Sequence, residues 1–218
     1  MKPALIEALH DAPMVADGAL GTQLYERGVL FTTNYDELSL SRPALVKRVH
    51  AEYLRAGAML LETNSFGANK FRLQRFGFEH RVREINAAAV ALAKAAVEEA
   101  HLDQRAYVAG SIGPTGMTLK GMTEDDRREV RKAFEEQIKG LVGEGGPAAP
   151  DALIIETMRQ PEELQLALTA AQEHSELPVV ALVSFDAFGT MADGTPPEKM
   201  ADLLAQWGAD VIGVNCGD

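Results

Sequence analysis

The sequence predicts an α/β protein of about six consecutive βα units around a parallel sheet, in one domain over residues 1–218. Short apolar runs alternate with stretches whose apolar residues recur every three or four positions, which is the pattern of alternating strands and amphipathic helices. The runs are apolar at almost every position, which suits strands that are covered on both faces of a parallel sheet. The order helix end, Gly-Ala, strand occurs at 56–63 and again at 207–215.

Six runs predict strands, each three to five residues long. They cover residues 14–16, 59–61, 107–109, 153–155, 179–183 and 211–214. A closed (β/α)8 barrel needs eight strands and typically about 250 residues. Six units in 218 residues therefore leave two architectures open, an open doubly wound sheet or a barrel that lacks its last units.

Helices are predicted between the runs. One apolar face follows the steps Val82, Ile85, Ala89, Leu92 and Ala96. A second helix carries apolar residues at 45, 49 and 53 and is expected to end at Gly57, because glycine tolerates the left-handed conformation of a helix end.

Helix starts have their own signals. Thr123 with Asp126, and Thr195 with Glu198, have the spacing of capping boxes. Pro43 and Pro161 are expected to open two further helices. The Gly- and Pro-rich segment 143–150 is expected to be a loop between units.

Composition excludes several classes of protein. The net charge of −11 argues against a nucleic-acid or anionic-membrane surface, and we interpret Lys70, Arg72 and Arg75 as a solvated face. Glu7 and Asp11 interrupt any signal-peptide core, and the apolar stretch 87–97 is too short to span a bilayer. A single cysteine allows no intrachain disulfide, so the expected compartment is the cytoplasm.

Polar residues follow every predicted strand, and in parallel α/β folds these carboxyl ends converge on one face. The set is Asp17, Glu62-Thr63-Asn64, Ser111, Glu156-Thr157, Ser184 with Asp186, and Asn215-Cys216. A carboxylate that ends an apolar run must be paired or functional, which applies to Glu62 and Glu156.

Structural explanations remain open for several of these residues. Asp17-Gly18 can be a turn, Ser111 fits a tight turn better than a nucleophile, and a lone cysteine is usually a small buried apolar residue. No glycine-rich nucleotide motif and no histidine pair with metal-binding spacing is present. We expect Trp207 to pack in the core.

Five motifs in order resemble the homocysteine S-methyltransferase family over about 200 residues. They are Asp17-Gly18-Ala19-Leu20-Gly21-Thr22, 62–69, Ala109-Gly110-Ser111-Ile112-Gly113-Pro114, Ile154-Ile155-Glu156-Thr157 and Gly213-Val214-Asn215-Cys216. The resemblance implies a (β/α)8 barrel of which this sequence matches the first six units, so that the domain would be incomplete at its C-terminus.

The resemblance also implies zinc-dependent transfer of a methyl group to the thiol of homocysteine, giving methionine. Family members bind zinc through three cysteines, of which Cys216 matches one; the adjacent pair after strand eight has no counterpart in this sequence. No catalytic residue beyond the zinc–thiolate site is implied. Zinc coordination deprotonates a thiol, and three protein ligands leave a fourth position for substrate sulfur.

The same resemblance assigns the substrate pocket. Asp17 and Glu156 match positions that hold the homocysteine ammonium group, and Thr63, Asn64 and Asn215 match the pocket lining. Glu62 precedes the matching residues and can be structural. The methyl donor is left open among methylcobalamin, methyltetrahydrofolate and a sulfonium or betaine compound, with cobalamin or folate arriving on another module of a longer chain.

Two other functions remain open at this point. One is a metal-free barrel lyase or hydrolase that uses Asp17 and Glu156 as acid and base. The other is an inactive or binding-only barrel fragment. The number of zinc ions bound per chain separates all three.

Overall fold

The computed structural model describes residues 4–102 and 105–217, which fold around one parallel sheet. Its strands lie in chain order, each hydrogen-bonded to the next. They are β1 (Leu60–Glu62), β2 (Tyr107–Ile112), β3 (Ala152–Met158), β4 (Val179–Val183) and β5 (Val211–Val214). A doubly wound sheet reverses its strand order at a switch point, whereas this order never reverses. The described sheet therefore has the topology of a barrel segment.

The first predicted strand is only partly confirmed. Residues 14–16 run parallel to β1 and exchange backbone hydrogen bonds with it, from Met59 N–H to the Val15 carbonyl and from Asp17 N–H to the Leu60 carbonyl. A single bridge between Ala16 and Leu60 forms, so the segment is no full strand. The other five strands are confirmed, and β2 and β3 extend beyond their predicted carboxyl ends.

The larger helices lie between the predicted strands, as the sequence predicts. The larger ones are α4 (Pro43–Ala56), α6 (Val82–Glu99), α7 (Glu124–Val142), α8 (Pro161–His174) and α9 (Pro197–Gln206). Shorter ones are α1 (Leu5–Asp11), α2 (Leu20–Glu26), α3 (Leu38–Ser41) and α5 (Lys70–Gln74). Two short 3₁₀ turns complete the set, η1 (Glu79–Arg81) and η2 (Gly146–Ala148), the second inside the segment predicted as a loop.

Most of the predicted helix boundaries are confirmed. Pro43 and Pro161 open α4 and α8, and Gly57 ends α4 with a φ of 104°. Thr123 and Asp126 form the predicted capping box. The prediction for Thr195 is wrong, because α9 begins at Pro197 after an N-cap at Pro196, and no side chain caps the helix.

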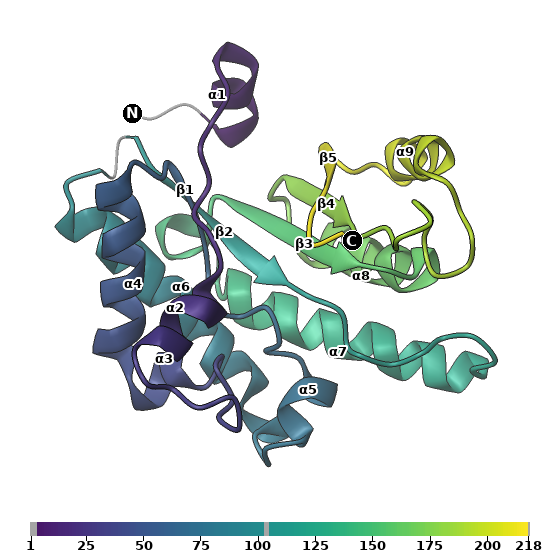
Figure 1. The fold of residues 1–218 in the computed structure, drawn as a ribbon, viewed down its shortest axis with the longest axis horizontal. Coiled ribbons are helices and arrows are strands. Elements are labelled where there is room, and N and C mark those ends of the chain that lie inside the picture. The colour runs from purple at the N-terminus through teal and green to yellow at the C-terminus, as the bar shows by residue number, and fades with distance from the viewer. Residues whose placement is uncertain (1–3, 103–104, 218) are drawn as a thin grey trace.

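The helices cover one face of the sheet, and α1 covers part of the other (Figure 1). On the outer face, α7 and α8 enclose the main cluster of buried apolar side chains, which Trp207 packs against as predicted. On the inner face, Leu5 of α1 packs against Tyr107, Ala109 and Ile154. Figure 1 shows α1 at the end of the molecule opposite to α5.

Every second residue of a strand lies on the same face of the sheet. On the inner face these residues change from apolar to polar toward the carboxyl ends of the strands. Residues 107 and 109 of β2 and residues 152 and 154 of β3 join the inner apolar cluster with α1. Two residues further along, the same face presents Ser111 and Glu156, and on β1 it presents Glu62. Polar side chains thus gather at the carboxyl ends of the strands. Within the described ranges, no helix has the length and apolar character needed to cross a membrane.

Candidate functional site

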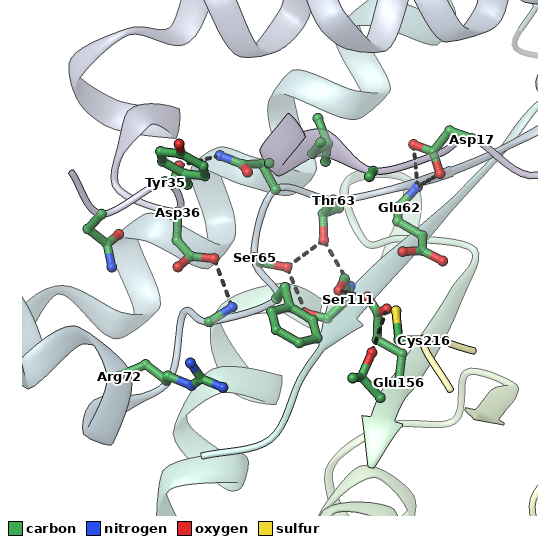
Figure 2. Close-up of a pocket in the computed structure, with 18 of the residues that line it drawn as sticks. Asp17, Tyr35, Asp36, Glu62, Thr63, Ser65, Arg72, Ser111, Glu156 and Cys216 are labelled. Carbon is green, nitrogen blue, oxygen red and sulfur yellow. Dashed lines mark hydrogen bonds between the residues drawn. The ribbon is translucent and has the colours of Figure 1, made fainter. Parts of the chain in front are cut away.

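A cavity of about 720 Å³ opens at the carboxyl ends of the strands. All six residues that the sequence predicts as ligands of substrate or metal line it, from four separate segments of the chain (Figure 2). They are Asp17, Thr63, Asn64, Glu156, Asn215 and Cys216. Ser184 and Asp186, which also follow a predicted strand, do not line this cavity.

Three carboxyl groups converge at one end of the cavity. Asp17 accepts hydrogen bonds from the Glu62 backbone N–H at 3.1 and 3.2 Å, which ties the segment before α2 to β1. Burial, followed by the charges of Glu156 and Asp17, raises the pKa of Glu62 to about 9. Burial, reinforced by the charge of Glu156, raises the pKa of Asp17 to about 7 against the hydrogen bond from Glu62. This end of the cavity therefore favours a cation, which relieves the repulsion between the carboxylates.

Glu156 is held in one orientation by two neighbours. The Ser111 hydroxyl donates to its Oε1 at 2.6 Å, and the Asn215 amide donates to its Oε2 at 2.9 Å. The carboxylate retains further acceptor capacity for a ligand in the cavity. Ser111 is therefore not the tight-turn residue that the sequence suggested, since it lies in β2 and positions Glu156.

Backbone strain marks the two residues beside this carboxylate. Thr157 has a φ of 59° and Cys216 a φ of 49°, a region that β-branched residues in particular avoid. Asn215 stabilises Thr157 by accepting its backbone N–H at 2.8 Å. Cys216 is free and exposed, so the interpretation of a buried apolar residue is wrong. Such strain is characteristic of functional sites.

Thr63 and Asn64 face the cavity but already have partners in the protein. The Thr63 hydroxyl lies 2.6 Å from that of Ser65 and accepts the Ser111 backbone N–H at 2.9 Å. The Asn64 amide donates to the Tyr35 carbonyl at 2.7 Å. Both side chains therefore hold the loop after β1 in place, and their contact with substrate stays a prediction.

The sequence analysis missed the other groups that hold this loop. Asp36 accepts the Gly67 backbone N–H at 2.9 Å, and burial raises the pKa of Asp36 to about 6. Gln137 donates from α7 to the Ser65 carbonyl at 2.8 Å. A Cβ on Gly113 would lie 2.6 Å from the Phe66 carbonyl oxygen, so only glycine fits there. Neither Asp36 nor Gln137 follows a strand, so no local pattern identifies them.

One of the three cations interpreted as a solvated face is half-buried in the wall of the cavity. Lys70 is exposed and pairs with Glu129 at 3.8 Å, as that interpretation requires. Arg72 and Arg75 line the cavity, and the Arg72 Nε donates to the Pro114 carbonyl at 3.1 Å. Arg72 is half-buried, so the interpretation is wrong for this residue, whereas Arg75 is exposed at the rim of the cavity and agrees with it.

The donors in the cavity do not form a complete zinc site. Structural and catalytic zinc sites need three or four protein ligands. Among the described lining residues, Cys216 is the sole thiol and no histidine is present. A separate group of Glu135, Glu173 and His174 on α7 and α8 has ligand-like spacing, but Arg131 already pairs with both glutamates.

Comparison with known proteins identifies the family. The model of the homocysteine S-methyltransferase family matches residues 14–218. Methionine synthases of Mycobacterium leprae and Mycobacterium tuberculosis are 30% identical to this chain over 226 aligned residues, covering 97% of the chain and 18% of each relative. The chain thus spans less than a fifth of their length.

A solved structure agrees with these relatives. The metallated form of the homocysteine methyltransferase MmuM from Escherichia coli superimposes with a TM-score of 0.80 at 26% identity, over 97% of this chain and 77% of that one. Three findings point to the same family. They are the parallel sheet in barrel order, the cavity at its carboxyl ends and the match of the family model over residues 14–218. The chain therefore belongs to the homocysteine S-methyltransferase family.

Proposed function

We propose that this chain forms the homocysteine-binding module of an enzyme that transfers a methyl group to the homocysteine thiol, giving methionine. The observation that carries the proposal is the convergence of Asp17, Glu62 and Glu156 at one end of the cavity that Cys216 also lines. A carboxylate cluster binds the substrate ammonium group through charge-assisted hydrogen bonds. Fixing the ammonium there would direct the thiol of the same molecule along the cavity wall.

The acidic end also sets the proton balance of binding. Because the pKa of Asp17 lies near 7, part of the free protein carries a proton on this carboxyl at neutral pH. An arriving ammonium favours the ionised carboxylate, so binding releases that proton. We expect homocysteine affinity to fall as the pH is lowered below about 7, and this dependence to weaken in Asp17→Asn.

Two charge-neutralising variants test the proposal. Asp17→Asn and Glu156→Gln keep the side-chain shape, and each removes a charged hydrogen bond worth about 1.5–3 kcal/mol. We expect calorimetry to show homocysteine affinity weakened by about 10- to 150-fold in each. Asp202→Asn, an exposed carboxylate on α9, is the matched control and should bind like the parent protein. Unchanged affinity in both cavity variants would rule out the ammonium role.

Zinc and the methyl donor belong to the same proposal. Cys216 would supply one ligand, and zinc would lower the pKa of the substrate thiol, which is about 8.5 for a free thiol. Since one thiol does not make a zinc site, no step here depends on the metal. A donor carried on a cobalamin or folate module is the alternative to a free donor molecule, and a cytoplasmic location is also proposed.

Because Cys216 is the sole thiol among the described residues that line the cavity, zinc binding can be predicted directly. Purified protein of these 218 residues should bind zinc with less than one equivalent per chain, because three or four ligands are needed. Elemental analysis after dialysis against excess zinc measures this, and Cys216→Ser should reduce any residual zinc. Tight stoichiometric zinc that survives Cys216→Ser would show that the ligand is misassigned. Metal-independent turnover of a non-thiol substrate would favour the lyase or hydrolase alternative.

A further inference from the structure

Arg72 and Arg75 form a cationic end of the cavity that the proposed homocysteine site does not use. Both side chains line the cavity, and both flank the backbone of Gly116. A Cβ on Gly116 would lie 3.5 Å from Arg72 Nε and 3.5 Å from Arg75 Nη2. Two guanidinium groups thus lie beside the same glycine of the cavity wall, that of Arg72 half-buried and that of Arg75 exposed at the rim.

The two arginines lack the partners that other cations of this chain have. In residues 4–102 and 105–217, no carboxylate lies within 4.0 Å of either guanidinium group, whereas Lys70 on the same helix pairs with Glu129. The charge of Arg72 lowers the pKa of two buried acids that lie further away, Asp36 and Glu163, although burial raises the pKa of both. Both are already hydrogen-bonded to backbone N–H groups, of Gly67 and Thr115. The pair of like charges is therefore left without an adjacent anion.

The cationic and acidic ends lie apart within one cavity. Figure 2 shows Arg72 and Asp17 on opposite sides of the view, with Ser65 and Thr63 between them. The ammonium and carboxylate of an amino acid are attached to the same carbon, so one homocysteine cannot place a charge at each end. The rings of Phe66 and Phe76 line the wall beside the arginines and offer apolar contact to a larger molecule.

We propose that Arg72 and Arg75 bind a carboxylate of the methyl donor, which makes the donor a carboxylate-bearing molecule that enters the same cavity as homocysteine. This proposal rests on the proposed function for the identity of the second reactant. The guanidinium fork matches the geometry of a carboxylate, and Arg72 is already oriented by its bond to Pro114. Amino-acid sulfonium compounds, betaines and reduced folates carry such a carboxylate, whereas the corrin of methylcobalamin does not.

Binding measurements on the full 218-residue chain test the proposal without requiring turnover. The probes are S-methylmethionine, its methyl ester, glycine betaine, 5-methyltetrahydrofolate and methylcobalamin, each titrated by calorimetry with homocysteine present. We expect at least one carboxylate donor to bind, and Arg72→Gln or Arg75→Gln to weaken it by at least about tenfold. The carboxylate probe that binds with the highest affinity identifies the donor class.

Four controls make the test specific. Lys70→Gln removes a neighbouring charge outside the cavity and should leave donor affinity unchanged, while Arg72→Lys should bind more weakly than the parent because the fork is lost. The methyl ester should bind more weakly than S-methylmethionine where that compound is the ligand. Homocysteine affinity should stay the same in both arginine variants.

The outcomes separate this proposal from the proposed function. Absence of homocysteine binding to the parent protein would contradict the proposed function, and the donor titrations, repeated without homocysteine, would still test the arginines. Donor affinity unaltered by both glutamine substitutions would overturn the proposal. The proposal would also be overturned if methylcobalamin were the one probe that binds. It would be overturned as well if the two glutamine substitutions weakened homocysteine binding and left donor binding unchanged.

Discussion

Asp17 illustrates, at the scale of one residue, how a binding site reduces stability. Its side chain is largely buried beside two other carboxyl groups, and burial raises its pKa from 3.8 to about 7. A carboxyl whose pKa is higher in the folded state than in the unfolded state favours folding only while it is protonated. Ionisation of Asp17 in the unfolded chain therefore costs folding free energy progressively as the pH rises from about 4 to 7.

A stability measurement on Asp17→Asn follows from that sign. At pH 8 the free energy of unfolding of the variant should exceed that of the parent by about 1–2 kcal/mol, after allowance for solvent screening. This difference should vanish near pH 3.5, where the carboxyl is mostly protonated in both states. Urea titrations at the two pH values measure it, with Asp202→Asn as the exposed control. The same variant should bind homocysteine more weakly, so stability and affinity would move in opposite directions. A variant less stable than the parent at pH 8 would contradict the buried-charge explanation.

At the scale of elements, the same residue type at two helix starts has different roles. The Thr123 hydroxyl accepts the Asp126 backbone N–H at 3.2 Å and donates to the Asp126 carboxylate at 2.7 Å. At the start of α9, two consecutive prolines move the cap to Pro196, and the Thr195 side chain caps nothing. The sequence spacing alone does not distinguish these two sites.

Alanine substitutions separate the two starts. Thr123→Ala should destabilise the protein by about 1 kcal/mol, because an N-cap bond is lost at the head of the 19-residue α7. Thr195→Ala should change the free energy of unfolding by less than about 0.5 kcal/mol. Paired thermal or urea unfolding measures both, and equal losses would mean that Thr195 does cap α9.

At the scale of the whole molecule, the described sheet has two sides with free backbone edges. Residues 14–16 and β5 each pair with a neighbour on one side among the described residues. Apolar side chains are exposed at both, Val15 at 65%, Ile212 at 43% and Val214 at 67%. Unpaired apolar edges are templates for pairing with another chain.

We therefore expect the 218-residue protein to associate as its concentration rises. Sedimentation velocity over a concentration series should show species larger than 23.5 kDa, and the double variant Ile212→Thr with Val214→Lys should shift the distribution to the monomer. Phe188→Lys, on an exposed loop, is the control and should leave association unchanged. A compact monomer at every concentration would refute the expectation.

Local patterns in the sequence account for the elements and for much of the site. Periodicity is a local property, so it predicted the larger helices and five of the six strands. Strand-end position predicted a wider set of polar residues, from which the resemblance to the family selected the six that line the cavity. The family motifs add the order of the units. These features depend on neighbours in the chain, which is why the sequence by itself determined them.

Only the tertiary structure decided which polar groups face each other. Ser111 reaches Glu156 from the neighbouring strand, Asp36 accepts the Gly67 backbone N–H from a distant segment, and Arg72 of α5 lies in the cavity wall. Each of these contacts joins segments that no short-range pattern relates. The strand order without reversal likewise follows from hydrogen bonding between strands, and this pairing is what separates a barrel segment from an open doubly wound sheet.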